Sequence, residues 1–133
     1  MQMIDTAHPY ISWYLWILGA VFGLFFALPL LVVPLRWARA FRWQLPADDR
    51  LTTYLGRSLG AVAAAVVFAA LRVAPEPAAH PIFFEIMIVA GALLTVVHIF
   101  GAIERSQPWT ETAEIPGYAA LTIVSIVIYR GLF

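Results

Sequence analysis

The residues best suited to chemistry are concentrated in one short segment, residues 98–114, which separates two long hydrophobic stretches. The segment contains one histidine, three glutamates, one arginine and two threonines, whereas the whole chain is 62% hydrophobic and 12% charged. Ionisable side chains beside the hydrocarbon of a membrane are costly, so those found there are candidates for function. This segment is therefore where we expect an active or binding site.

His98, Glu104 and Arg57 are the residues that we expect to act in catalysis if the protein is an enzyme. The imidazole of His98 exchanges protons near neutral pH, and Glu104 could share this acid–base chemistry if the two groups lie within hydrogen-bond reach. Arg57 and His98 each lie about five residues inside one end of a hydrophobic stretch, so their depths match at ~1.5 Å per residue. An arginine in apolar surroundings favours a carboxylate partner, for which we expect Glu104 or Glu114. Such a pair could also be purely structural.

Five further residues are expected to line or cover the site: Trp109, Thr122, Glu85, Glu111 and Glu114. Glu111 and Glu114 are three positions apart and would share one face of a helix. One histidine with several carboxylates suits a hard or borderline divalent metal. The spacing matches no metal-binding motif, however, so we assign no metal ligands and leave the cofactor unknown. Alternatively, threonine and glutamate directly before an apolar run indicate a helix start, where acids favour the positive end of the helix dipole.

The other polar side chains within the hydrophobic stretches have both structural and functional interpretations. Thr122 belongs to a stripe of hydroxyls on one helical face, which could line a polar cavity or form ordinary hydrogen bonds to backbone. The stripe consists of Tyr118, Thr122, Ser125 and Tyr129. Glu85 lies one turn inside its stretch. It is expected to pair with Arg72 or Arg130, unless it is a protonatable carboxylate for ion-coupled transport.

Four hydrophobic stretches must position these residues, because each contains the ~20 mostly apolar residues needed to cross ~30 Å of hydrocarbon. They cover residues 10–35, 52–73, 81–103 and 115–133. The connections between them are short, which favours antiparallel neighbours. The predicted fold class is an all-α integral membrane protein in which four transmembrane helices form an antiparallel up-down bundle. One membrane domain is expected to cover residues 1–133.

The distribution of arginine predicts how the chain lies in the membrane. Most arginines fall in the first loop (residues 36–51) and the third loop, namely Arg36, Arg39, Arg42, Arg50 and Arg105. The N-terminal tail and the second loop contain none. Because basic residues favour the cytoplasmic side, the basic loop is expected in the cytoplasm and both termini outside it.

Composition also limits the location and the partners of the protein. Absence of cysteine excludes disulfides and thiolate metal sites, and a net charge of zero offers no basic surface to nucleic acid. All eight basic residues are arginines, and alanine, glycine and proline are frequent, as in GC-rich bacterial genomes. We therefore expect a multi-pass protein of the bacterial cytoplasmic (inner) membrane, with the lipid bilayer as its partner.

Small residues recur at every fourth position in the first two hydrophobic stretches. They are Gly19, Gly23 and Ala27 in the first stretch and Gly56, Gly60 and Ala64 in the second. This spacing lets two helix backbones approach closely. It predicts either packing of the first helix on the second or an interface in a homo-oligomer or larger membrane complex. Pro29 and Pro34 should kink the first helix, because each removes a backbone donor.

Three functions agree with these features. The first is a non-catalytic scaffold, assembly or accessory subunit of a membrane complex, since no recognisable set of catalytic residues is present. The alternative is a membrane-embedded enzyme for a lipid or isoprenoid-like substrate, with acid–base chemistry at His98 and Glu104 and a charge held by Arg57. The third is a transporter of protons or small solutes with Glu85 and His98 at the ends of its path. These two residues lie about 140° apart around one helix, which makes a single straight path awkward.

Overall fold

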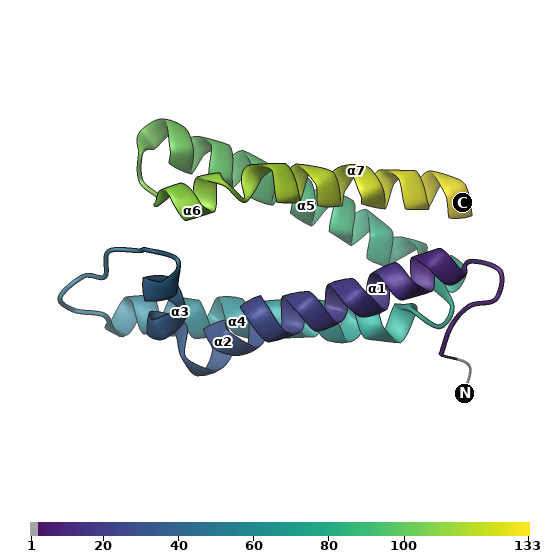
Figure 1. Ribbon diagram of the computed structural model, residues 1–133, viewed down its shortest axis with the longest axis horizontal. Helices are drawn as coiled ribbons and strands as arrows, with labels where there is room; N and C mark the ends of the chain where they lie inside the picture. Colours follow the sequence, from purple (N-terminus) through teal and green to yellow (C-terminus); the bar gives the residue numbers. More distant parts are fainter. Residues whose placement is uncertain (1–2) are drawn as a thin grey trace. The chain divides into compact units, whose positions relative to one another are not determined.

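The computed structural model describes residues 3–133, and every regular element in this part of the chain is a helix (Figure 1). Four helical segments are long and apolar enough to cross a membrane: Pro9–Val32, Arg50–Val73, Pro81–Glu104 and Trp109–Leu132. The predicted all-α fold and the four membrane-spanning segments are therefore confirmed. The chain divides into two compact units, Met1–Pro77 and Ala78–Phe133, and each unit holds two of these segments.

The first hydrophobic span is interrupted rather than continuous. It consists of α1 (Pro9–Phe22), a π-helical segment η1 (Gly23–Ala27) and α2 (Leu28–Val32), and it is followed by α3 (Pro34–Ala40). Val33 leaves the helical conformation, with a φ of −132° and a ψ of 54°, because the ring of the following proline disfavours the α region there. The predicted kink at Pro34 is confirmed, and the spanning segment ends at Val32 rather than at residue 35.

Pro29 creates a second irregularity, because a proline cannot donate the hydrogen bond that a helix places on the carbonyl four residues earlier. Here that carbonyl belongs to Phe25, and it accepts a hydrogen bond from the indole N–H of Trp37 at 3.0 Å. The ring of Trp37 also contacts Phe26 and Phe41, with centroid distances of 5.2 and 4.2 Å. Trp37 therefore satisfies a polar group that Pro29 leaves without its usual backbone donor.

Replacing Trp37 with phenylalanine is expected to destabilise the protein by about 1 kcal/mol, because it keeps a ring but removes the donor to a carbonyl within the apolar span. Reversible unfolding in mixed micelles with increasing dodecyl sulfate measures this change. In a Pro29→Ala background the backbone N–H at position 29 can serve the Phe25 carbonyl instead. Trp37→Phe should then cost clearly less, and an equal cost in both backgrounds would contradict the assignment.

Helix α4 (Arg50–Val73) packs antiparallel on the first span, and glycines mark the closest approach. Gly19, in α1, faces Leu71 near the end of α4, whereas Gly60, nearer the start of α4, lies against the backbone of Leu30 and Leu31. Two further close pairs are Gly23 with Val67 and Gly56 with Pro34. Gly19, Gly23 and Gly60 therefore serve the packing of the first span on α4, and Gly56 serves the packing of α3 on the same helix. Packing of the first helix on the second is one of the two interpretations that the spacing allows.

A buried serine ties the start of α1 to the end of α4. The hydroxyl of Ser12 donates to the carbonyl of Ala74 at 2.6 Å and accepts a hydrogen bond from the N–H of Asp5 at 3.0 Å. The carboxylate of Asp5 accepts a hydrogen bond from the N–H of Ala7 and lies 3.1 Å from Nδ1 of His8. Both contacts lower the pKa of Asp5, because they favour its charged form. The segment before α1 is thus bonded to α1 and, through Ser12, to the end of α4.

The second unit is built on an antiparallel pair of helices. A short 3₁₀ turn, η2 (Pro77–Ala79), precedes α5 (Pro81–Glu104), and α7 (Ile115–Leu132) runs back along α5. Between them the chain forms a turn and the short helix α6 (Trp109–Thr112) (Figure 1). The polar segment of the sequence therefore spans the last turns of α5, the connecting turn and α6.

Helix α5 ends in a tight reversal that directs the chain back toward α6. Arg105 has a positive φ of 55°, and the N–H groups of Arg105 and Ser106 bond to the carbonyls of Ala102 and Gly101. This is the Schellman pattern of a helix end, whose left-handed position usually holds glycine. An arginine there carries a cost of about 1 kcal/mol. Because this position is Arg105 and not a glycine, the sequence does not signal the reversal.

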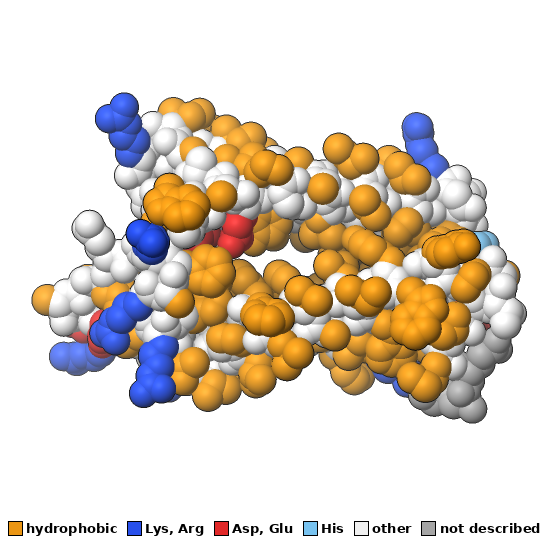
Figure 2. All heavy atoms as spheres, in the orientation of Figure 1, with side chains coloured by type: hydrophobic (Ala, Val, Ile, Leu, Met, Phe, Trp, Pro, Cys, Tyr) orange, Lys and Arg blue, Asp and Glu red, His pale blue; other side chains and the backbone are white. Residues whose placement is uncertain are grey.

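Large apolar side chains remain exposed along both units, and Figure 2 shows them along the helices on the face in view. Phe25 in the first unit and Ile103 in the second are 71% and 72% exposed. Extensive exposed apolar surface marks a site of contact with a membrane or another protein. Together with the four spanning segments, this surface defines a multi-pass membrane protein.

Candidate functional site

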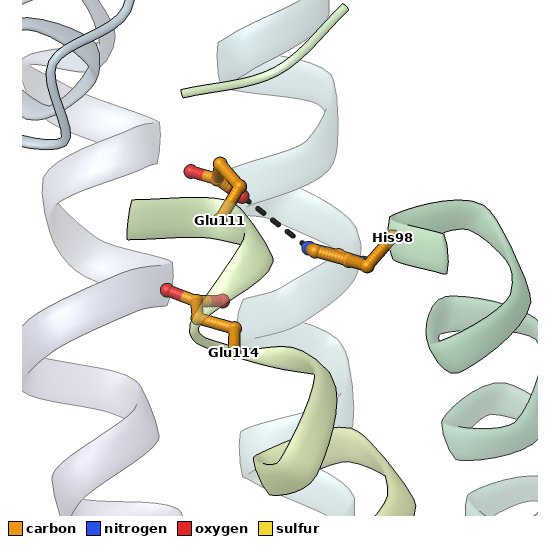
Figure 3. A group of neighbouring side chains, drawn as sticks. All are labelled: His98, Glu111 and Glu114. Atoms are coloured by element: carbon orange, nitrogen blue, oxygen red, sulfur yellow. Dashed lines mark hydrogen bonds and ion pairs between the residues drawn. The ribbon is translucent and has the colours of Figure 1, made fainter. Parts of the chain in front are cut away.

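His98 and Glu111 form a buried polar pair inside the second unit. His98 lies on α5, two turns before its end, and Glu111 lies in the first turn of α6. Nε2 of His98 is 3.3 Å from Oε2 of Glu111, and the two residues are only 8% and 7% exposed. Figure 3 shows the ring and this carboxylate directed toward one another, with Glu114 beside them. The reversal after α5 thus brings together two groups that are thirteen residues apart.

The hydrogen bonds of the imidazole determine where its protons lie. Nδ1 of His98 is 2.8 Å from the carbonyl oxygen of Leu94, and a carbonyl can only accept a hydrogen bond, so Nδ1 carries a proton. In the neutral ring, Nε2 then presents a lone pair toward the Glu111 carboxylate, which is also an acceptor. Two acceptors 3.3 Å apart attract one another only when a cation lies between them. A proton or a metal ion would meet this requirement.

Glu114 adds a second carboxylate to this pair. One ligand atom from each of His98, Glu111 and Glu114 can be chosen so that all three lie within 4.8 Å of one another. Glu114 immediately precedes α7, as the helix-start interpretation predicts, but its side chain makes no capping hydrogen bond there. Its carboxylate instead accepts a hydrogen bond from the hydroxyl of Tyr118, which holds it beside the His98–Glu111 pair.

Gln107 holds the turn that carries Glu111, and sequence reasoning missed it. Its side-chain amide donates to the carbonyl of His98 at 3.0 Å and to the hydroxyl of Thr112 at 3.1 Å. A Cβ at position 101 would collide with the side chain of Gln107, whose Cδ would be 2.7 Å away. The absence of a side chain at Gly101, in the last turn of α5, is thus the feature of the sequence that could have indicated the close approach of Gln107 to that helix.

The hydroxyl stripe of α7 faces α5 in this unit. The ring of Tyr118 packs on that of His98 with a centroid distance of 4.7 Å, and the Thr122 hydroxyl donates to the carbonyl of Tyr118 at 2.9 Å. Thr122 lies against Gly91 of α5, and Ser125 is 2% exposed. Thr122 therefore belongs to the contact between the two helices and bonds to backbone, which is the structural interpretation of the stripe.

Glu85 lies near the other end of the same pair of helices. Its carboxylate accepts a hydrogen bond from the hydroxyl of Tyr129 at 2.9 Å. The expected pairing with Arg130 is not found among the described residues of this unit, where Arg130 is exposed. Adjacent residues point ~100° apart around a helix, so Tyr129 facing α5 turns Arg130 away. Glu85 thus has a local hydroxyl partner at a distance from the His98 cluster.

The other predicted site residues, Glu104, Arg57 and Trp109, have exposed side chains. Glu104 is the last residue of α5 and is exposed. Six residues along one helix correspond to a rotation of about 120° from His98, so the carboxylate partner of His98 is Glu111 and not Glu104. Arg57 lies on α4 in the first unit with an exposed side chain, and Trp109 begins α6 and is 65% exposed. The roles expected of Arg57, which is to hold a charge, and of Trp109, which is to line or cover the site, remain predictions.

No protein-family model, curated protein or solved structure matches the chain. The fold and the site by themselves define a small multi-pass helical membrane protein with a cluster of one histidine and two glutamates, of which His98 and Glu111 are buried.

Proposed function

We propose that this protein is a bacterial inner-membrane protein whose function depends on a cation held by His98, Glu111 and Glu114. The observation that carries the proposal is the 3.3 Å approach of Nε2 of His98 to the Glu111 carboxylate while Nδ1 bonds to Leu94. The positive-inside rule supports placing the basic loop and this cluster at the cytoplasmic boundary, with both termini outside and the four spans arranged up and down.

Such a cluster suits chemistry on a molecule that reaches the membrane boundary. With a proton as the cation, His98 and Glu111 form an acid–base pair that gives or takes a proton from a bound substrate. With a metal ion as the cation, the same groups hold a Lewis acid. In both cases a lipid or isoprenoid-like substrate fits the surroundings, Glu111 takes the part expected of Glu104, and Trp109 would cover the site.

A scaffold or accessory subunit, alone or as a homo-oligomer, is the competing function. It requires only that the helices fold and present their surfaces, so it predicts that the polar cluster can be replaced by uncharged groups of similar shape. The two functions are therefore distinguished by substitutions that keep size and remove charge.

We expect His98→Gln and Glu111→Gln each to abolish the cellular function of the protein, assayed as complementation of a deletion strain. The matched controls are His80→Gln and Glu104→Gln. His80 is an exposed histidine outside the spans, and Glu104 is an exposed glutamate on α5, the helix that holds His98. Membrane levels and melting temperatures in detergent are measured for all four, so that lost function is separated from lost folding. If all four variants complement like the wild type, the cluster is structural and the scaffold function stands.

A further inference from the structure

We propose that the cation is a divalent metal ion, bound by Nε2 of His98 and by one carboxylate oxygen each from Glu111 and Glu114. The inference rests on the proposed function and specifies its ligand. It assigns a metal centre at the junction of α5, α6 and α7 (Figure 3).

The separation of the donor atoms fits a metal site. Metal–nitrogen and metal–oxygen bonds to zinc are about 2.0–2.2 Å, so two ligands of a tetrahedral ion lie roughly 3.4 Å apart. Nε2 of His98 and Oε2 of Glu111 are 3.3 Å apart. The third donor, from Glu114, lies within 4.8 Å of the other two. The Glu114 carboxylate accepts a hydrogen bond from the Tyr118 hydroxyl, and binding the ion would exchange that bond for a metal bond.

The groups around the histidine also match a metal ligand. Metal-binding histidines commonly donate their second ring N–H to a backbone carbonyl or a carboxylate, which fixes the tautomer and aims the other nitrogen at the ion. His98 does this through Nδ1 and Leu94 at 2.8 Å. Gln107 ties α5 to α6 at the same level through its bonds to His98 and Thr112, and so positions Glu111.

The charge of the cluster also favours a divalent metal ion. Two carboxylates and one neutral imidazole carry two negative charges, which a divalent ion neutralises. Neutral clusters are far less costly beside hydrocarbon than separate charges. One nitrogen and two oxygen donors suit zinc, manganese or iron(II), and a site with three protein ligands keeps a coordination position for water or substrate.

The test uses the full-length protein in detergent after chelator treatment, with Co²⁺ as a visible-absorbing probe and Zn²⁺ alone in calorimetry. One equivalent of Zn²⁺ should bind, and it should displace Co²⁺. His98→Ala and Glu111→Gln should each weaken binding at least about 100-fold, whereas Glu114→Gln should weaken it less because a half-exposed ligand is more easily replaced by water. His80→Ala and Glu104→Gln should bind as the wild type does.

A cysteine substitution tests direct coordination even if binding is weakened. His98→Cys should produce a thiolate-to-Co²⁺ charge-transfer band in the near ultraviolet that neither the wild type nor His80→Cys shows. Absence of that band, or Zn²⁺ affinity that is unchanged by His98→Ala, would overturn the metal centre.

The outcomes separate this inference from the proposed function. If His98→Gln and Glu111→Gln abolish complementation while the wild type binds no Zn²⁺, Mn²⁺ or Fe²⁺, the cation is a proton and the metal centre alone is rejected. If Zn²⁺ binds as expected but both variants complement fully, the metal centre stands and the proposed function is rejected.

Discussion

Replacement of Gly60 by leucine is expected to prevent α4 from packing on α2 and to cost about 3 kcal/mol or more of folding free energy. The reason is the nature of the neighbour. A Cβ at position 60 would lie 2.8 Å from the carbonyl carbon of Leu30, and backbone atoms inside a helix cannot move aside as a side chain can. Gly60→Ala should already cost about 1–3 kcal/mol. Dodecyl sulfate unfolding monitored by circular dichroism measures both variants.

Two other glycines provide a graded control for this prediction. A Cβ at Gly19 would meet the side-chain tip of Leu71 at 2.8 Å, and a Cβ at Gly117 would meet nothing within 4 Å. Gly19→Ala should therefore cost less than Gly60→Ala, and Gly117→Ala should be neutral or stabilise α7 by up to about 1 kcal/mol. If the three alanine variants lose equal stability, close backbone contact at Gly60 does not govern the packing.

Gly91→Ala is expected to destabilise the second unit by about 1–3 kcal/mol, because the added methyl group overlaps Thr122 of α7. The new carbon would lie 2.5 Å from the Thr122 hydroxyl oxygen and 3.3 Å from its backbone nitrogen. That hydroxyl cannot turn away freely, since it is bonded to the carbonyl of Tyr118. Thermal unfolding in detergent reports the loss.

A second substitution in the same pair tests the cause. Thr122→Ala removes the hydroxyl oxygen that the methyl group strikes, so Gly91→Ala should cost less in this background, and the difference is the coupling energy of the pair. Gly131→Ala, at a position on α7 with nothing within 4 Å, is the matched control and should be neutral. Strictly additive losses from Gly91→Ala and Thr122→Ala would show that the contact does not limit the approach of the helices.

The fold could be read largely from sequence because membrane insertion depends on local properties. A segment of sufficient length and apolar content satisfies its own backbone hydrogen bonds as a helix, whatever its neighbours are. The third span was predicted at 81–103 and is found at Pro81–Glu104. Likewise the break before Pro34 follows from the covalent geometry of proline alone. The role of Trp37 toward the Phe25 carbonyl depends on how α3 folds back, which no local pattern contains.

The candidate site could be predicted from the sequence only in part. His98 stands out because an imidazole within an apolar run is costly, and helical periodicity already argues against Glu104 as its partner. The true partner follows from a turn. That turn depends on the left-handed conformation of Arg105 and on the hydrogen bond from Gln107 to the carbonyl of His98. The sequence has no glycine at position 105 that would indicate such a conformation.

The sequence by itself thus determined the class of protein, the number of spans and the histidine at which chemistry is proposed, since hydropathy and residue type are properties of single segments. The tertiary structure alone decided which carboxylates meet that histidine. The physical reason is that α6 is a separate short helix. Its position against α5 results from hydrogen bonds across the turn, from Gln107 to the carbonyl of His98 and between His98 and Glu111, which helical periodicity does not predict. A helix-start signature and a metal ligand look the same in sequence, and they differ only in where Glu111 and Glu114 point.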